Sequence, residues 1–427
     1  MLRMDQPTFC HAVMTPEDFS KYRVFVESLF SSTWLAQSAP HRLRTVWRRT
    51  DKLAKVEIAS LGFFIKQLEP EHKRWLADTV QDVKDQDQSP HGPLFEIVTL
   101  GSLAARGMNV RPMKKHFPGY DAVVSDRDGY NLRVSIKNHD ISTHEKQFRF
   151  ESARLANIVR RRVLASAAGW QAVIRSRTHL DTSAFEEIAR VLRATPIRSG
   201  ELAPGLFPKR GASIQMRKLS DSKFLPGSYT CNVMCPQTAY EQARFRKNIN
   251  IAIKKFDEHS PRSPEYSNVI FMRLHGSADV EEVRRYANEA IAKEGCSVDA
   301  ILLYQAVVGY DNITQGITYY ATHVVSARYK GPSLKFPLQF LSGAVVSKPL
   351  GRELVIASSE EVTHVDDIAS EYSYQRGELR YRVQEGRTAF EFPDPIPGIK
   401  QKLSFRHHDG IVQFSQPCIE DEDLVLL

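Results

Sequence analysis

The feature that most constrains the fold is a pair of short β-rich runs separated by a polar turn. Residues 120–124 and 132–136 are rich in valine and other apolar side chains. Residues 125–129 between them contain the Asp-Gly pair that is typical of hairpin turns. This part of the chain is therefore expected to form an antiparallel hairpin, which brings the start of its first strand beside the end of its second strand.

Polar residues occur where such a hairpin brings its ends together. Asp121 lies at the start of the first strand, and Ser135 and Lys137 share one face near the end of the second. Glu96 lies just upstream, on an apolar-patterned helix that we expect to end near Gly107. Two carboxylates provide the oxygen ligands that Mg²⁺ prefers. A nearby ammonium group can orient a water molecule and offset charge on a phosphate.

In their order and spacing, these residues resemble the signature of the PD-(D/E)XK nuclease superfamily. The resemblance implies a restriction-endonuclease-like core: a helix that carries Glu, then strands that carry Asp and (Asp or Glu)-x-Lys, then a second helix. It implies that Glu96 and Asp121 are catalytic and bind Mg²⁺ or Mn²⁺. The main-chain carbonyl of Ile136 would be a further metal ligand, and Lys137 would be the catalytic lysine. Ser135 stands in the place of the second acid.

The serine removes one formal negative charge that would help to hold a divalent cation. We expect weaker metal binding unless Glu96, Asp140 or Glu151 compensates for it. A nuclease fold that has lost cleavage and binds nucleic acid, or acts in an assembly, is the main alternative function.

Two other interpretations of these residues stay open. His139 and His144 can supply a histidine base or metal ligand, although residues five apart do not share a helical face. In a purely structural interpretation, Glu96 caps a helix, Asp121 ends a strand and Lys137 extends from a sheet edge.

The net charge of +8 favours a polyanionic partner, and DNA is the partner that we expect first. Arginines gather in two places: a basic stretch that contains a tryptophan near residue 47, and a helix expected over residues 142–166. A solvated helix face explains the same charges without any ligand. The candidate nucleic-acid contacts are Arg48, Arg49, Arg154, Arg160 and Arg161.

The element pattern predicts an α/β protein in four regions. Between residues 240 and 304 helices alternate with apolar strands, which is typical of a parallel sheet. The predicted regions are an N-terminal helical part (1–88), the nuclease-like core (89–230), an α/β part packed on or completing that core (231–330) and a β-rich part (331–427).

Composition narrows the class of protein. No run approaches the roughly 18 apolar residues of a membrane helix, and five cysteines disfavour a disulfide framework. We therefore expect a cytoplasmic protein that has no membrane partner and acts as a homo-oligomer or with a partner subunit. The expected activity is metal-dependent phosphodiester hydrolysis, in the context of defence against foreign DNA. An interaction protein, whose affinity for DNA would lack salt dependence, is the remaining alternative.

Overall fold

A computed structural model shows a mixed α/β protein that divides into two compact units. The first unit comprises Met1–Asp140, Phe245–Pro349 and Glu422–Leu427, and the second comprises Ile141–Arg244 and Leu350–Asp421. The structure describes residues 16–325, except 40, 50–51, 86–90, 115–116, 164–165, 167, 206, 208–210, 219–228, 237–238, 276–277, 279 and 311–314, together with 328–329, 331, the later strands given below and 426–427.

The first unit is built around a six-stranded mixed sheet, in the order β1-β2-β3-β8-β9-β10 among the described residues. β1, β2 and β3 form an antiparallel meander, β3, β8 and β9 are parallel, and β10 is antiparallel to β9. The strands are β1 (Asn109–Pro112), β2 (Ala122–Ser125), β3 (Asn131–His139), β8 (Tyr266–Leu274), β9 (Ala300–Tyr310) and β10 (Gln315–Val325).

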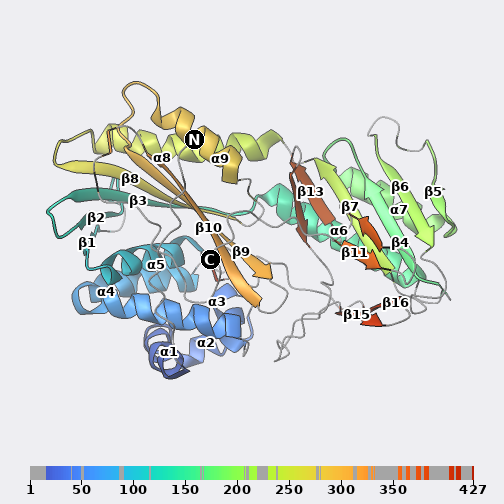
Figure 1. Ribbon diagram of the computed structural model, residues 1–427, viewed down its shortest axis with the longest axis horizontal. Helices are drawn as coiled ribbons and strands as arrows, with labels where there is room; N and C mark the ends of the chain where they lie inside the picture. The colour runs from blue at the N-terminus through green and yellow to red at the C-terminus, as the bar shows by residue number, and fades with distance from the viewer. Residues whose placement is uncertain are drawn as a thin grey trace. The chain divides into compact units, whose positions relative to one another are not determined.

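Helices cover both faces of this sheet. In Figure 1, α8 and α9 lie on one face, while α5 and α4 lie on the other. The apolar side chains of α8 and α9 bury Ile270 and Met272 of β8, and on the other face Phe95 of α5 stacks on Tyr304 of β9 at 5.6 Å. The helices are α1 (Pro16–Phe30), α2 (Ser32–Leu35), α3 (Arg42–Arg48), α4 (Lys52–Asp85), α5 (His91–Ala105), α8 (Ala239–His259) and α9 (Val280–Ile291).

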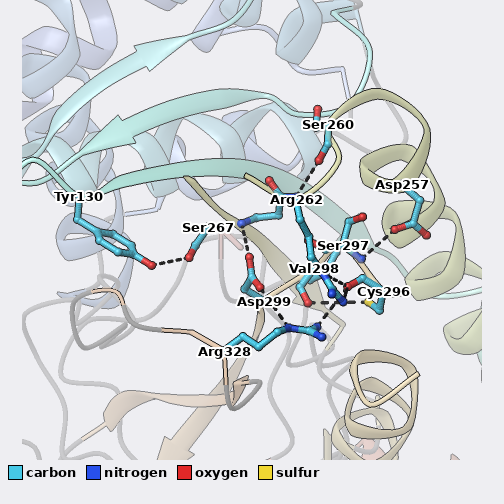
Figure 2. Close-up of polar contacts among 11 residues, drawn as sticks. Tyr130, Asp257, Ser260, Arg262, Ser267, Cys296, Ser297, Val298, Asp299 and Arg328 are labelled. Atoms are coloured by element: carbon cyan, nitrogen blue, oxygen red, sulfur yellow. Dashed lines mark hydrogen bonds and ion pairs between the residues drawn. The ribbon is translucent and has the colours of Figure 1, made fainter. Parts of the chain in front are cut away.

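A polar network holds the N-terminal ends of β8 and β9 (Figure 2). Lys137 of β3 is opposite Met272, near the other end of β8. The side chain of Asn268 donates to the carbonyls of Ser260 and Ser297 at 2.9 and 2.8 Å, and its amide donates to Asp299 at 2.9 Å. The Cys296 carbonyl accepts hydrogen bonds from two arginine side chains nearby. Because Asn268 and Asp299 are buried, these bonds satisfy groups that would otherwise destabilise the fold.

The second unit has its own sheet, in the order β14-β13-β7-β4-β6-β5. α6 and α7 pack together in this unit, and α6 also packs against β7. Its described elements are α6 (Thr143–Val163), β4 (Trp170–Arg175), α7 (Thr182–Ala194), β5 (Gly200–Leu202), β6 (Ser213–Lys218), β7 (Tyr229–Pro236), β11 (Leu354–Ala357), β12 (Val362–Val365), β13 (Tyr372–Arg376), β14 (Leu379–Val383), β15 (Leu403–His407) and β16 (Gly410–Phe414).

The division of the chain differs from the four predicted regions. The helices of residues 1–88 share a unit with the α5–β3 segment, because α4 packs along α5. The segment 89–230 is split at Asp140, because the sheet that follows belongs to the second unit. Residues 231–330 and 331–427 are each divided between the units. The α/β class is confirmed, and the hairpin forms as expected, with Gly129 at a positive φ of 80° in its turn.

No helix within the described ranges has both the length and the apolar character to cross a membrane.

Candidate active site

The candidate site lies where β2 begins and β3 runs on beyond it. Ala122, the first residue of β2, is opposite Val134, so β3 from Ser135 to His139 has no partner on that side from β2. Asp121 directly precedes β2. Its amide donates to the Val134 carbonyl at 2.8 Å, and its carbonyl accepts from the amide of Met113 at 2.9 Å. The backbone of Asp121 is therefore held from both neighbouring strands.

The Asp121 carboxylate collects three donors from β3. Its Oδ2 accepts from the Ile136 amide at 2.5 Å, from Lys137 Nζ at 3.1 Å and from Ser135 Oγ at 3.2 Å. Lys137 Nζ also donates to the Ile136 carbonyl at 3.0 Å. Ser135 is completely buried, whereas the side chains of Asp121 and Lys137 are 32% and 26% exposed. A solvent-accessible ion pair is thus anchored on a buried hydroxyl and a main-chain amide.

Strand register places Lys137 on the sheet face that α8 covers. Ser135 and Lys137 are opposite Ile270 and Met272, which pack in the core beneath α8 and α9. Asn138 points to the other face, towards α5. A Cβ added at Gly92 of α5 would lie 3.9 Å from the Cβ of Asn138. α5 packs against β1 and β3 from that side.

Glu96 is one helical turn after Gly92 on α5 and is half-buried. The structure therefore brings Asp121, Ser135, Ile136 and Lys137 into direct contact. It places Glu96 on a helix that packs against β3 from the opposite face to Lys137.

Two acids that were considered as replacements for the missing carboxylate are occupied elsewhere. Asp140 Oδ1 lies 2.8 Å from His91 Nδ1 and 3.0 Å from Arg273 Nη1, and Arg273 is only 2% exposed. Glu151 belongs to the second unit, where its Oε2 lies 2.7 Å from Arg154 Nε. Of the three proposed substitutes, Glu96 is the one on α5, a helix that packs against β3.

His91, which lies at the start of α5 beside Asp140, has a lowered pKa. Burial, together with the positive charges of Arg273 and Arg42, holds the pKa of His91 well below its usual range. Asp140 raises that pKa but offsets only part of the effect. His91 is therefore neutral at physiological pH, and the buried charge pair is Asp140 with Arg273.

The two arginines near Trp47 that were predicted to contact nucleic acid differ in burial. Arg48 is exposed at the end of α3, whereas Arg49 is only 3% exposed, so Arg48 is the better placed of the two for contact with a phosphate. The guanidinium of Arg23 lies 3.5 Å from the Trp47 ring centroid and covers one face of that ring. This stretch packs as part of the helical layer, because Trp47 is covered by Arg23 of α1, and Arg44 stacks on Trp34 of α2 at 4.1 Å.

The arginines of α6 lie in the second unit, whereas Lys137 belongs to the first. The guanidinium of Arg154 lies 2.7 Å from Glu151 and 2.6 Å from Glu186, which gives it a structural role in tying α6 to α7. Arg160 and Arg161 are exposed, and no ion pair involves them within the described ranges. These two remain available for contact with a polyanion.

Within the described residues, no group of three or more His, Cys, Asp or Glu side chains is arranged to hold a metal ion. A cation at Asp121 would therefore depend on Ile136 O, Glu96 and oxygens from water or substrate. No protein-family model and no curated protein matches the chain.

Proposed function

We propose that the protein hydrolyses phosphodiester bonds of nucleic acid, DNA first, using Mg²⁺ or Mn²⁺ at a PD-(D/E)XK-like site. One observation carries this proposal. Lys137 Nζ lies within 3.1 Å of both Asp121 Oδ2 and the Ile136 carbonyl oxygen, where β3 extends beyond β2. These are the lysine, the aspartate and the backbone ligand that the resemblance requires, and they meet around a single position.

That position suits a cation, because a positively charged group already occupies it. A carboxylate and a main-chain carbonyl are hard oxygen ligands of the kind that Mg²⁺ and Mn²⁺ accept. The resemblance implies Glu96 as the second acid, on α5, which packs on the other face of β3. When bound, the ion would provide Lewis acidity and would lower the pKa of a coordinated water.

The side chains and main-chain groups around Asp121 have separate roles in the proposed reaction. The Ile136 amide and the Ser135 hydroxyl hold the Asp121 carboxylate in one orientation. The Lys137 ammonium can orient the attacking water and stabilise the negative charge that develops on the phosphate. The water oxygen forms a bond to phosphorus and the bond to the leaving oxygen breaks. One proton of the water passes to solvent, and the leaving oxygen takes a proton from solvent.

The order of elements supports a restriction-endonuclease-like core with one change. α5, the β1–β3 meander and a later helix follow the family pattern, but we assign the second helix to α8 instead of α6. α8 contributes Phe245 and Asn248, whose side chains contact His139 of β3 at 4.1 Å between ring centroids and at 2.6 Å. α6 packs with α7 and β7 in the second unit. A long insertion would therefore separate the two halves of the core.

A second candidate is a degenerate nuclease fold that binds nucleic acid without cleaving it. Ser135 supplies no charge, and Lys137 forms an ion pair with Asp121. The charge of the Asp121 carboxylate is therefore balanced without a metal ion. Both candidates require nucleic-acid binding, and they differ in whether a divalent cation displaces the lysine.

The deciding experiment incubates plasmid, linear duplex and single-stranded DNA and RNA with the wild-type protein, with and without Mg²⁺ or Mn²⁺. Asp121→Asn and Lys137→Met should each abolish cleavage. Ser135→Asp, which restores the acid of the signature, should raise the rate at limiting metal, and Ser135→Ala is its matched control. Cleavage that survives in both Asp121→Asn and Lys137→Met would exclude this site. Lack of cleavage in every condition, including with Ser135→Asp, would favour the degenerate fold.

A further inference from the structure

Four planar side chains form a continuous row beside the candidate active site. The rings of Phe117 and Tyr120 are 5.0 Å apart between centroids. The Arg133 guanidinium lies 5.8 Å from the Tyr120 ring and 4.4 Å from the Tyr266 ring. We call these residues the aromatic–arginine row. The row combines flat hydrophobic faces with a positive charge, which are the two components of a surface that binds unpaired nucleotides.

The row is joined to the catalytic candidates by the chain itself. Tyr120 directly precedes Asp121, and Arg133 is on the same face of β3 as Ser135 and Lys137, because side chains alternate along a strand. Lys137 is four residues after Arg133 on the strand, a distance of about 13 Å at roughly 3.3 Å per residue. That length corresponds to a short stretch of nucleotides, so one strand can contact both groups.

Strand register adds a second arginine to this face. Arg111 of β1 is opposite Val123 of β2, and Val123 is opposite Arg133 of β3, so both guanidinium groups project from the same side of the sheet. Arg111 and Lys114 are exposed. None of Arg111, Lys114 and Arg133 forms an ion pair with a carboxylate among the described residues. Their positive charge is therefore free to attract phosphates.

Two features of the aromatic–arginine row favour stacking with a planar ligand: a fixed guanidinium and an exposed ring. Arg133 Nη1 donates to the Pro261 carbonyl at 3.1 Å, which fixes the guanidinium over the Tyr266 ring. Phe117 is 41% exposed, although burial of a phenylalanine normally stabilises a fold. Its exposure is most useful if a planar ligand covers the ring.

We propose that the aromatic–arginine row binds unpaired nucleotides that flank the scissile bond, so that the substrate is a single strand or a frayed end. This inference rests on the proposed function and specifies its substrate class. Bases within a duplex are stacked on one another and cannot lie on Phe117, whereas unpaired bases can. Stacking on an aromatic side chain contributes about 1–3 kcal/mol per base, or roughly 5- to 150-fold in affinity.

The test measures binding separately from cleavage. Fluorescence anisotropy with an Asp121→Asn background, in EDTA, compares a labelled 15-mer of deoxythymidine with a 15-base-pair duplex. The expected result is tighter binding to the single strand, weakened about tenfold or more by Phe117→Ala and by Arg133→Met. Phe117→Trp keeps the stacking surface and should retain the affinity. Phe150→Ala, which removes a 66% exposed phenylalanine elsewhere, is the matched control, and Arg74→Met is the control for the loss of an exposed arginine.

The outcomes separate this inference from the proposed function. Equal or tighter binding to duplex by the Asp121→Asn protein would overturn it, even if the wild-type protein cleaves DNA. Unchanged single-strand affinity in both Phe117→Ala and Arg133→Met would also overturn it, provided that thermal melting shows both variants folded. Loss of affinity in Phe117→Ala that Phe117→Trp restores would support it, whether or not cleavage is found. A loss of melting temperature without a change in affinity would assign the row to stability alone.

Discussion

The position of Lys137 leads to a prediction in which metal affinity and activity change in opposite directions. Its Nζ lies 3.1 Å from Asp121 Oδ2 and 3.0 Å from the Ile136 carbonyl, the two protein oxygens that we propose as metal ligands. A divalent cation must therefore compete with the lysine for them. Lys137→Met removes the charge while keeping a side chain of similar length, so we expect tighter Mn²⁺ binding and loss of hydrolysis.

The magnitude follows from the exposure of the pair. The side chains of Lys137 and Asp121 are 26% and 32% exposed, so solvent screens their attraction. Ion pairs of this kind contribute about 0.5–1 kcal/mol, and 1.4 kcal/mol corresponds to a tenfold change in affinity. The dissociation constant for Mn²⁺ should therefore fall about two- to fivefold. The rate should drop by about two orders of magnitude or more, because the group that stabilises the developing charge is gone.

Titration of Mn²⁺ followed by electron paramagnetic resonance gives the affinity, and cleavage of a labelled oligonucleotide gives the rate. Asp121→Asn is the control that should weaken Mn²⁺ binding, because it removes the charged ligand. Weaker or unchanged Mn²⁺ binding by Lys137→Met would refute the idea that the lysine occupies the place of the cation. Full activity in the same variant would refute its catalytic role.

Three further predictions concern the surroundings of the site. Because the pKa of His91 is held well below its ordinary 6.5, the unfolded chain takes up a proton at a higher pH than the folded chain does. The free energy of unfolding should therefore be fully retained above about pH 6.5 and fall by up to about 1.4 kcal/mol per pH unit below it. Urea denaturation of His91→Gln should lack this part of the pH dependence. Asp140→Ala leaves the buried Arg273 without its carboxylate and should lower the free energy of unfolding by about 3–5 kcal/mol, whereas a loss below about 1 kcal/mol in urea denaturation would contradict the pairing. Gly119→Ala should cost about 1–3 kcal/mol in the same assay, since Gly119 has a φ of 103° and a Cβ there would lie 2.6 Å from Ser260 Oγ; an unchanged midpoint would contradict it.

Local features of the fold could be predicted from the sequence because neighbouring residues determine them. The Asp-Gly turn sets the register of the hairpin, and that register brings Asp121 beside Lys137. The helix end at Gly107 is equally local, since glycine readily adopts its positive φ of 79°. These contacts span few residues, so turn chemistry and alternation along a strand suffice to predict them.

The rest depended on pairing between distant segments. β3 pairs in parallel with β8, so that Lys137 is opposite Met272, and nothing in either strand specifies the other. For this reason the helix that follows the hairpin, α6, was assigned to the core in place of α8. Arg133 was also missed as a site residue, although a signal was present, because it lies two residues before Ser135 on the same strand face. Its partners Tyr120 and Tyr266 come from separate parts of the chain.

The distribution of charge along the chain indicates which segments would attract a nucleic acid. Residues 141–244 hold 17 lysines and arginines against 8 acids, whereas the remaining residues hold 41 against 42. The segment between β3 and the main part of α8 is therefore strongly basic, but each unit as a whole has an excess of four positive charges, with 33 lysines and arginines against 29 acids in the first unit and 25 against 21 in the second. Counterion release, which depends on phosphate contacts, should come from exposed groups of that segment, such as Arg160 and Arg161, and from exposed groups of the first unit, such as Arg111 and Lys114. With an excess of only four positive charges, the unit that carries Asp121 and Lys137 would also need local contacts to hold its substrate, which is the role that the aromatic–arginine row can fill.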